Sequence, residues 1–237
     1  MAALLAVAMM LQMLPMLAFA DGAPGTGETY VAWNENKGNK GYTTLKEAVD
    51  EAKSGETIIL GEGSYTLYKS DSKTKGKDLT FVGQGPDKTI WQIGPTAPNP
   101  ALFGTEYNSD YSFDGAGKIT FKNMKLCTGK ADYLGFTRPD RTVVDHCEIY
   151  GKTFYWGYTS AVFTDTTFYA PPFDYAIWTY SSPAMEFDNC TFNTTGKAVN
   201  VYTDYSAGSH DIRVYFNNCT VNSSFSLGKQ ALTINDS

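Results

Sequence analysis

Two aspartates and two arginines have the side-chain types for chemistry on an acidic sugar. Asp145 and Asp188 could hold a Ca²⁺ ion that neutralises a sugar carboxylate, and Arg138 or Arg141 could remove the neighbouring proton. The two aspartates share one position of a sequence repeat but lie two repeats apart, about 9.6 Å if the repeats stack as strands. Since Ca²⁺ lies about 2.3 to 2.6 Å from its oxygens, both cannot bind one ion without loops. We therefore treat these four residues, Arg138, Arg141, Asp145 and Asp188, as an alternative, lyase-like site.

Aromatic side chains offer a different kind of site. Between residues 154 and 180, eleven of 27 residues are Phe, Tyr or Trp. Several of them alternate with core positions and should face outward, where flat rings with a hydroxyl or an indole N–H suit sugar rings. Alternatively, these rings fold back onto the protein as a second core. The predicted ligand-binding residues are Trp156, Tyr158, Tyr169, Phe173, Tyr175 and Tyr180.

Composition and spacing argue against other classes of site. A formal net charge of −6 and a pI near 4.9 disfavour nucleic acid as a partner, because phosphate binding needs a basic surface. His146 and His210 are not paired by spacing, and no Cys/His cluster in the sequence resembles a zinc site. We predict no metal site and no cofactor, with Ca²⁺ reserved for the lyase-like alternative.

A repeated eight-residue segment must position these side chains. Its copies are ITFKNMKL (119–126), TVVDHCEI (142–149), AVFTDTTF (161–168), MEFDNCTF (185–192) and VYFNNCTV (214–221). The central apolar residue advances by 23, 19, 24 and 29 residues from copy to copy, the spacing of a structural repeat. A second series, AIWTY from Ala176, AVNVY from Ala198 and ALTIN from Ala231, interleaves with the first. Stacked units of several strands each would produce two such series.

Two positions of the repeat carry characteristic side chains. The second residue after the central one is Asn123, His146, Asp165, Asn189 or Asn218, types that favour a column of turns. The third is Met124, Cys147, Thr166, Cys190 or Cys219, which indicates a small buried position. We expect free thiols there, although a Cys190–Cys219 disulfide stays open because stacked strands bring the Cα atoms within range. Cys127 lies outside this column and has no expected partner.

Length and local signals divide the chain into three parts. Residues 1–20 are uncharged and end in Ala-Phe-Ala, which predicts a cleaved signal peptide, with a membrane anchor as the alternative. Residues 21–41 predict a flexible lead-in with one short strand at 29–33, and residues 42–237 a single β domain. A capping box of Thr44 and Glu47 predicts a helix over 44–53, closed by Gly55. Because ALTINDS has no polar cap, we expect a longer natural protein.

The entry to this domain resembles a known family. TTLKEAVDEAKSGETIILGEGSYTL (43–67) followed by LTFVGQGPDKTIW (79–91) is similar to the opening of the pectin lyase-like superfamily, and of pectin methylesterases in particular. The resemblance implies an all-β fold, a right-handed single-stranded parallel β-helix whose first coil is covered by a short N-terminal α-helix. Such a helix covers apolar surface that has no neighbouring coil.

The catalytic motif of pectin methylesterases is not matched. Those enzymes carry a Gln-Asp pair after a GY step and a nucleophilic Asp in GTVDFIFG. Here GKTFYWG offers Thr153, Phe154 and Tyr155 at that place, and no Gln-Asp pair follows Gly151. Ester cleavage needs two positioned carboxylates, so we carry over no catalytic residue.

These observations predict a secreted or cell-surface β-helix module, bacterial in style. It would be non-catalytic and adhesin-like, presenting a surface to a glycan or a surface protein, without a membrane span in the mature chain. One alternative is a polysaccharide-active enzyme of pectinesterase or pectate-lyase type. The other is a structural stalk of a larger surface protein.

Overall fold

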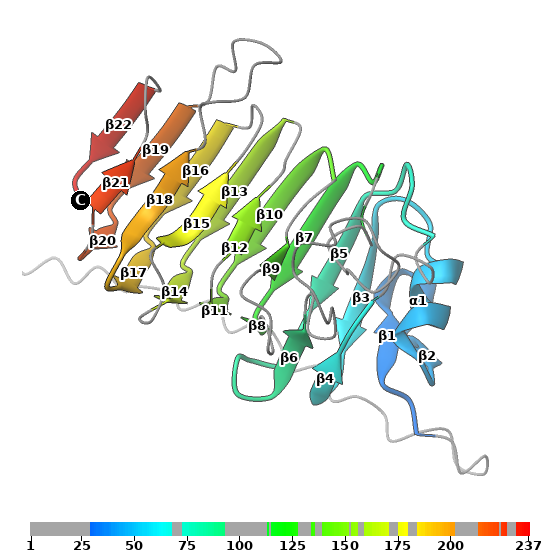
Figure 1. Ribbon diagram of the computed structural model, residues 1–237. Coiled ribbons are helices and arrows are strands. Elements are labelled where there is room, and N and C mark those ends of the chain that lie inside the picture. Colours follow the sequence, from blue (N-terminus) through cyan, green and yellow to red (C-terminus); the bar gives the residue numbers. More distant parts are fainter. Residues whose placement is uncertain are drawn as a thin grey trace, which may run out of the picture.

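Three long β-sheets make up most of the computed structural model (Figure 1). It describes residues 29–67, 73–92, 113, 115–127, 134–135, 139–151, 153–155, 159–170, 175–179, 184–201, 213–222, 224–226 and 231–237. The predicted signal peptide, residues 1–20, lies outside these ranges. No helix within them is long and apolar enough to span a membrane.

The first sheet has ten described strands and is parallel from β3 onward. In spatial order it comprises β2 (Lys40–Tyr42), β1 (Ala32–Asn34), β3 (Glu56–Leu60), β5 (Leu79–Val82), β7 (Lys118–Lys122), β10 (Arg141–Asp145), β13 (Ser160–Thr164), β16 (Ala184–Asp188), β19 (Arg213–Asn217) and β22 (Ala231–Asn235). Every predicted copy of the repeat contributes one strand here. The sequence pattern therefore located the central part of this sheet.

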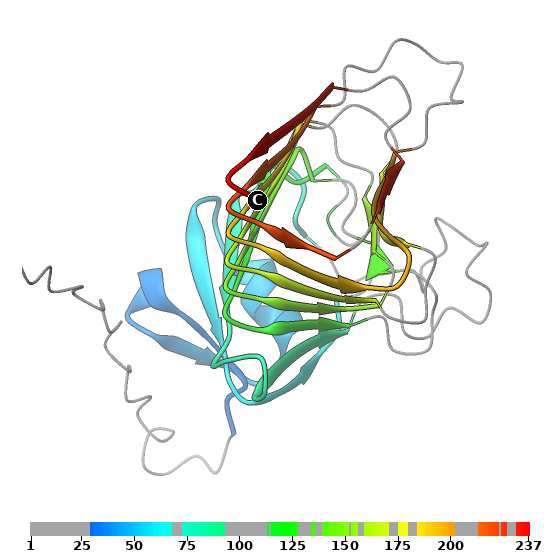
Figure 2. The same cartoon turned by 90° about the vertical axis from the view of Figure 1, so that its left-hand side faces the viewer.

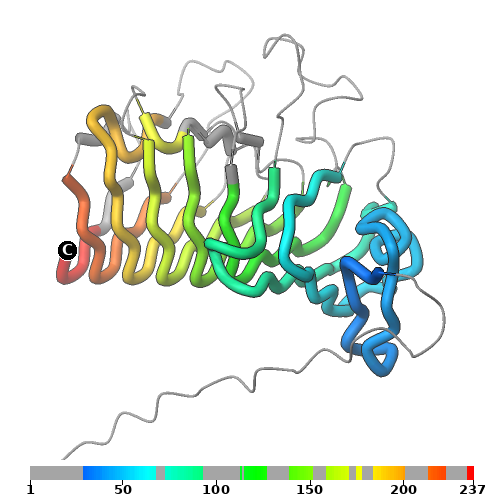
Figure 3. The backbone as a smooth tube through the Cα atoms, turned by 90° about the horizontal axis from the view of Figure 1, so that it is seen from below, coloured from blue at the N-terminus to red at the C-terminus, as the bar shows by residue number. Residues whose placement is uncertain are grey.

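The second and third sheets continue the same succession of repeats. The second comprises β4 (Gly63–Tyr65), β6 (Thr89–Gln92), β8 (Lys125–Cys127), β11 (Glu148–Tyr150), β14 (Thr167–Ala170), β17 (Thr191–Thr194) and β20 (Thr220–Val221). The third comprises β9 (Leu134–Gly135), β12 (Thr153–Tyr155), β15 (Tyr175–Thr179), β18 (Lys197–Val201) and β21 (Ser224–Ser226). Figure 2 shows the three sheets as three walls, and Figure 3 shows the repeats lying side by side along the molecule.

Stacked aromatic rings fill the space between the first two sheets. In-register pairing places Phe163, Phe187 and Phe216 directly over one another, with ring centroids 5.1 and 4.9 Å apart. Phe168 and Phe192 stack in the same way in the second sheet at 4.4 Å. The two stacks meet edge to face, a geometry worth roughly 0.5–1.5 kcal/mol per pair beyond the area buried.

The predicted helix is confirmed as α1 (Leu45–Glu51), at the end of the molecule beside β1–β3 (Figure 1). The Thr44 hydroxyl accepts the N–H of Glu47 at 3.2 Å, and one face of the helix is buried in the core. Its end differs from the prediction, because Ala52 is already extended and Gly55, at φ 89°, lies in the turn before β3. There the Gly55 N–H bonds to Asp78 at 2.7 Å, so pairing with the neighbouring repeat ends the helix early.

The N-terminal lead-in is more ordered than predicted from residue 32 onward. β1 pairs antiparallel with both β2 and β3, and the 3₁₀ turn η1 (Glu35–Lys37) connects the first two. The Gly and Asn residues that suggested flexibility instead form the reversal, with Gly38 and Asn39 at φ 64° and 59°. The side chain of buried Asn34 donates to Glu56 at 2.7 Å and ties this ribbon to β3.

The segment ALTIN belongs to the first series, which corrects its assignment to the second. It forms β22, where Ile234 pairs with Phe216, whereas AIWTY and AVNVY contribute β15 and β18 of the third sheet. Its continuation explains the difference, because Asp236 takes the turn position at φ 49° and Ser237 the small position that follows. ALTINDS is thus a further copy of the main repeat.

Thr142 generates the first testable prediction. Its side chain is 1% exposed in the inner row of β10, and its hydroxyl has no hydrogen-bond partner among the described residues. Replacing Thr142 with Val keeps the shape and removes the unsatisfied group, so Thr142→Val should raise the free energy of unfolding by about 1 kcal/mol in urea denaturation.

Thr166→Val is the matched control. The Thr166 hydroxyl donates to the Thr164 carbonyl at 2.9 Å and accepts from the Cys147 N–H at 3.5 Å, so its loss should destabilise the protein. Destabilisation by Thr142→Val to the same extent would contradict the prediction.

Candidate functional site

The turn between the first and second sheets is built identically in successive repeats. One residue of each turn has left-handed backbone geometry, with φ between 48° and 55°: Asn123, His146, Asp165, Asn189, Asn218 and Asp236. Asn and Asp tolerate this conformation better than other non-glycine residues, so the predicted column of turns is confirmed. His146 is the member of this column whose side chain is an imidazole ring with two nitrogen atoms.

Hydrogen bonds continue from the sheet through these turns. The N–H groups of Asn123, His146 and Asp165 each donate to a carbonyl of the next repeat, at 3.1, 3.0 and 3.0 Å. Asn189 and Asn218 do the same at 2.9 and 2.8 Å. The turns therefore stack as tightly as strands, and their side chains lie in one line along the molecule.

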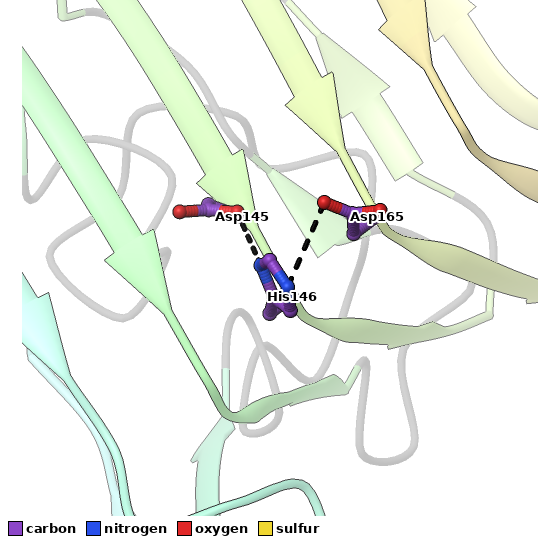
Figure 4. A group of neighbouring side chains, drawn as sticks. All are labelled: Asp145, His146 and Asp165. Carbon is purple, nitrogen blue, oxygen red and sulfur yellow. Dashed lines mark hydrogen bonds and ion pairs between the residues drawn. The ribbon is translucent and has the colours of Figure 1, made fainter. Parts of the chain in front are cut away.

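A cluster of ionisable side chains interrupts this line of asparagines (Figure 4). His146 Nδ1 lies 2.6 Å from Asp145 Oδ1, and His146 Nε2 lies 3.6 Å from Asp165 Oδ2. The other oxygens are also engaged, because Lys122 Nζ lies 3.0 Å from Asp145 Oδ2 and the Asn189 amide donates to Asp165 Oδ1. We call these five residues, Lys122, Asp145, His146, Asp165 and Asn189, the polar ladder.

The polar ladder holds Asp145 in its charged form. Partial burial opposes ionisation, but the hydrogen bonds from His146 and Lys122 outweigh it, so the pKa of Asp145 is lower than usual. The Asp145 carboxylate therefore accepts a hydrogen bond from the N–H at His146 Nδ1. The other ring nitrogen, His146 Nε2, faces Asp165, as Figure 4 shows. Along the polar ladder, the side chains of Lys122, His146 and Asn189 thus alternate with the carboxylates of Asp145 and Asp165.

The ladder offers few free ligand atoms for a metal ion. Asp145, His146 and Asp165 each place a ligand atom within 4.8 Å of the others. The 3.6 Å between His146 Nε2 and Asp165 Oδ2 is close to the ~3.4 Å expected across a tetrahedral zinc ion with bonds of about 2.1 Å. Asp145 would then only orient the imidazole, and two ligands are fewer than the four of a structural zinc site. We therefore interpret the ladder as an interaction that fixes the turns.

The lyase-like residues are not brought together in the described part of the chain. Asp145 and Asp188 lie on the same outer row with Thr164 between them, in the order that the repeat predicts. Arg141 begins β10, four residues before Asp145, and its Nε lies 3.5 Å from Asp140. Arg138 lies outside the described residues.

The predicted aromatic site is only partly described. Tyr169 faces outward on β14 and stacks on Tyr150 with ring centroids 4.6 Å apart. Tyr175 is 8% exposed, which corrects its assignment as a surface residue. Because Ala176 and Ile177 are also buried, both faces of β15 are covered there, and alternation along the strand does not expose a side chain. The remaining four, Trp156, Tyr158, Phe173 and Tyr180, lie outside the described residues.

Tyr150 is a surface residue that the sequence reasoning missed. It pairs with Tyr169, which in turn pairs with Asn193, and we call these three the tyrosine row. Lys125 Nζ lies 4.9 Å from the centre of the Tyr150 ring, and the Tyr150 hydroxyl donates to Glu148 at 3.1 Å. The sequence signal for this row is the alignment of three consecutive repeats, in which EIY (148–150), TFY (167–169) and TFN (191–193) occupy the same positions.

His146 and Asp165 were also missed as an interacting pair. Both stood in the predicted column of turns, in consecutive copies of the repeat. The residue types in that column predict backbone geometry, but they do not show that successive turns stack and bring these two side chains together. Comparison of the sequence with protein-family models and with curated proteins found no match. The proposals for function therefore depend on the motifs and geometry described above.

The lowered pKa of Asp145 generates the second prediction. A lowered carboxyl pKa contributes stability above the ordinary carboxyl pKa near 4, and that stability is lost as pH falls through the lower value of the folded state. Asp145→Asn should therefore cost about 1 kcal/mol of unfolding free energy at pH 7, and less near pH 3. Urea denaturation at the two pH values measures both numbers.

Asp188→Asn is the matched control, on the same outer row but outside the polar ladder. It should change the unfolding free energy less than Asp145→Asn at pH 7. An effect of Asp145→Asn that does not vary with pH would show that the charge of Asp145 is not what the ladder uses.

Proposed function

We propose that this chain is an exported, non-catalytic module that contacts carbohydrate or protein at a cell surface in the manner of an adhesin. Its fold would be a right-handed parallel β-helix. The observation that carries this proposal is the tyrosine row, in which Tyr150 and Tyr169 stack in register on the outer side of the second sheet, beside Lys125 and Asn193.

The strand order supports the β-helix. Successive repeats add one strand to the first sheet, one to the second and, where described, one to the third, and the buried residues form one continuous core. Right-handed crossovers are the rule for parallel strands of one sheet. The resemblance of residues 43–91 to the pectin lyase-like superfamily points the same way, and the uncharged residues 1–20 support export.

The chemistry of the outer face favours recognition by hydrogen bonds. Each stacked tyrosine covers a face of the other ring, so the row presents ring edges, hydroxyls and the Asn193 amide. A parallel row of hydroxyls lies beside it, with Thr167 and Thr191 on two of the same strands and Thr220 on β20. Sugars and peptide backbones both offer the matching donors and acceptors. Pairing in a sheet holds these groups in place before a ligand arrives, which lowers the entropic cost of binding.

The state of the carboxylates supports a non-catalytic role. Both oxygens of Asp145 and both of Asp165 face a partner within the polar ladder. The sequence also lacks the carboxylate pair of pectin methylesterases. The hydrogen bonds from His146 and Lys122 lower the pKa of Asp145 and make it a weak base, which disfavours proton removal by this carboxylate.

A glycan-array assay on the purified chain gives the third prediction. Wild type should bind at least one glycan, and the double variant Tyr150→Ala/Tyr169→Ala should bind it at least about tenfold more weakly, the effect of losing roughly 1.4 kcal/mol. Tyr215→Ala, on the outer side of the first sheet, is the matched control and should bind like wild type. Circular dichroism of each variant checks that the fold is retained.

Cleavage of polygalacturonate and methylated pectin is scored on the same protein with and without Ca²⁺. Cleavage would overturn the non-catalytic proposal. Equal weakening by Tyr215→Ala would remove the tyrosine row as the site. Failure to bind any glycan or protein ligand, without cleavage, would favour the structural stalk.

A further inference from the structure

A cysteine or serine at the small position after a turn bonds to two carbonyl groups. Cys190 Sγ lies 3.5 Å from the Asp188 carbonyl of its own repeat and 3.3 Å from that of Phe163 in the preceding one. Cys219 Sγ makes the corresponding contacts, at 3.3 Å, with Asn217 and Phe187. The described thiols Cys147, Cys190 and Cys219 are free and buried, as the sequence predicted.

Cys190 and Cys219 occupy this position in consecutive repeats. The Thr220 N–H donates to the Cys190 carbonyl at 2.9 Å, which fixes the two turns one above the other and stacks the two thiol positions. A strand spacing of about 4.8 Å lies within the Cα separation that a disulfide spans. Cys147 has no such neighbour, because Thr166 stands between its repeat and that of Cys190.

The two thiols differ in access to solvent. Cys219 lines a cavity of about 170 Å³ together with Phe216, Val221, Ile234 and Ser237, where β20 and β22 are the outermost described strands. Ile234 is 50% exposed beside this cavity. Cys190 lies one repeat further in and is not part of the lining. Cys219 is therefore the thiol of the pair that borders the cavity.

We propose that Cys190 and Cys219 are an oxidisable thiol pair, in which Cys219 attacks an incoming disulfide and Cys190 resolves the product. The Cys219 thiolate attacks one sulfur of the oxidant disulfide, forms a mixed disulfide and releases one thiolate. Cys190 then loses its proton and attacks Cys219 Sγ, which forms the Cys190–Cys219 disulfide and releases the second thiolate. The two protons from the cysteines end on the two released thiols, and the oxidant disulfide takes up the two electrons.

The acidity of the thiols agrees with these roles. The interaction with Cys190 lowers the pKa of Cys219, whereas the interaction with Cys219 and burial raise the pKa of Cys190. Burial raises the pKa of Cys147 to about 12. Thiolate therefore forms most readily at Cys219, the thiol that lines the cavity. The assignment does not depend on the proposed binding function.

Oxidation of the full chain tests the proposal. Fully reduced protein is treated with oxidised glutathione at pH 7.5, and its products are followed by intact mass and peptide mapping. We expect the loss of two hydrogens and a single link between the peptides that carry Cys190 and Cys219. The link closes a loop of 29 residues (219 − 190), so the melting temperature should rise by roughly 10 °C.

Cys190→Ser separates attack from resolution. Serine should preserve the fold, since Ser237 Oγ bonds to Asn235 and Phe216 from the same position at 3.0 and 3.4 Å. This variant should stop at a glutathione adduct on Cys219, and Cys219→Ser should give neither adduct nor link. A link to Cys127 or Cys147, an adduct on Cys147 as fast as on Cys219, or no reaction of Cys219 would each overturn the proposal.

Discussion

Parallel pairing in register between successive repeats is the constraint on which the other features of this protein depend. It places each side chain directly against the side chain at the same position of the next repeat, about 4.8 Å away. Phenylalanine on phenylalanine is favourable in this arrangement, as the stack from Phe163 to Phe216 shows. Carboxylate on carboxylate would not be, and the polar ladder avoids it by placing the His146 imidazole on one side of Asp165 and the Asn189 amide on the other.

The same constraint explains which parts of the fold were predictable. Core positions of the first sheet recur in the sequence because each must present an apolar side chain to its neighbours, so most copies of the repeat could be found by pattern. ALTIN was misassigned because five alternating residues fit either series, and only Asp236 and Ser237 distinguish them. The short strand predicted at 29–33 overlaps β1, whereas β2 was not predicted, because it is held largely by antiparallel backbone hydrogen bonds, which leave little trace in side-chain pattern.

The candidate sites were harder to predict than the strands. The prediction that Tyr169 faces outward is confirmed, because one face of β14 is accessible, but the same prediction is wrong for Tyr175, where both faces of β15 are covered. Whether a strand is covered on its outer side depends on segments distant in sequence. The contact of His146 with Asp165 likewise depends on stacking between turns, and the pKa of Asp145 depends on Lys122 from the preceding repeat. Neither the contact nor the effect on the pKa can be recognised in the sequence of a single repeat.

The turn between the first and second sheets, which carries the polar ladder, has a constant length in these repeats, whereas the other connections vary in length. In the five copies of the repeat between residues 119 and 221, the central residue of the first-sheet strand lies five residues before the inward residue of the second-sheet strand, as from Val144 to Ile149 or from Phe187 to Phe192. The variation in length among these copies, from 19 to 29 residues, therefore falls elsewhere. One residue inserted at this corner would reverse the two faces of a second-sheet strand, whereas insertions in the other connections leave both registers intact. These repeats can thus lengthen in their loops, but not at this corner, without changing which face of the second-sheet strand is buried.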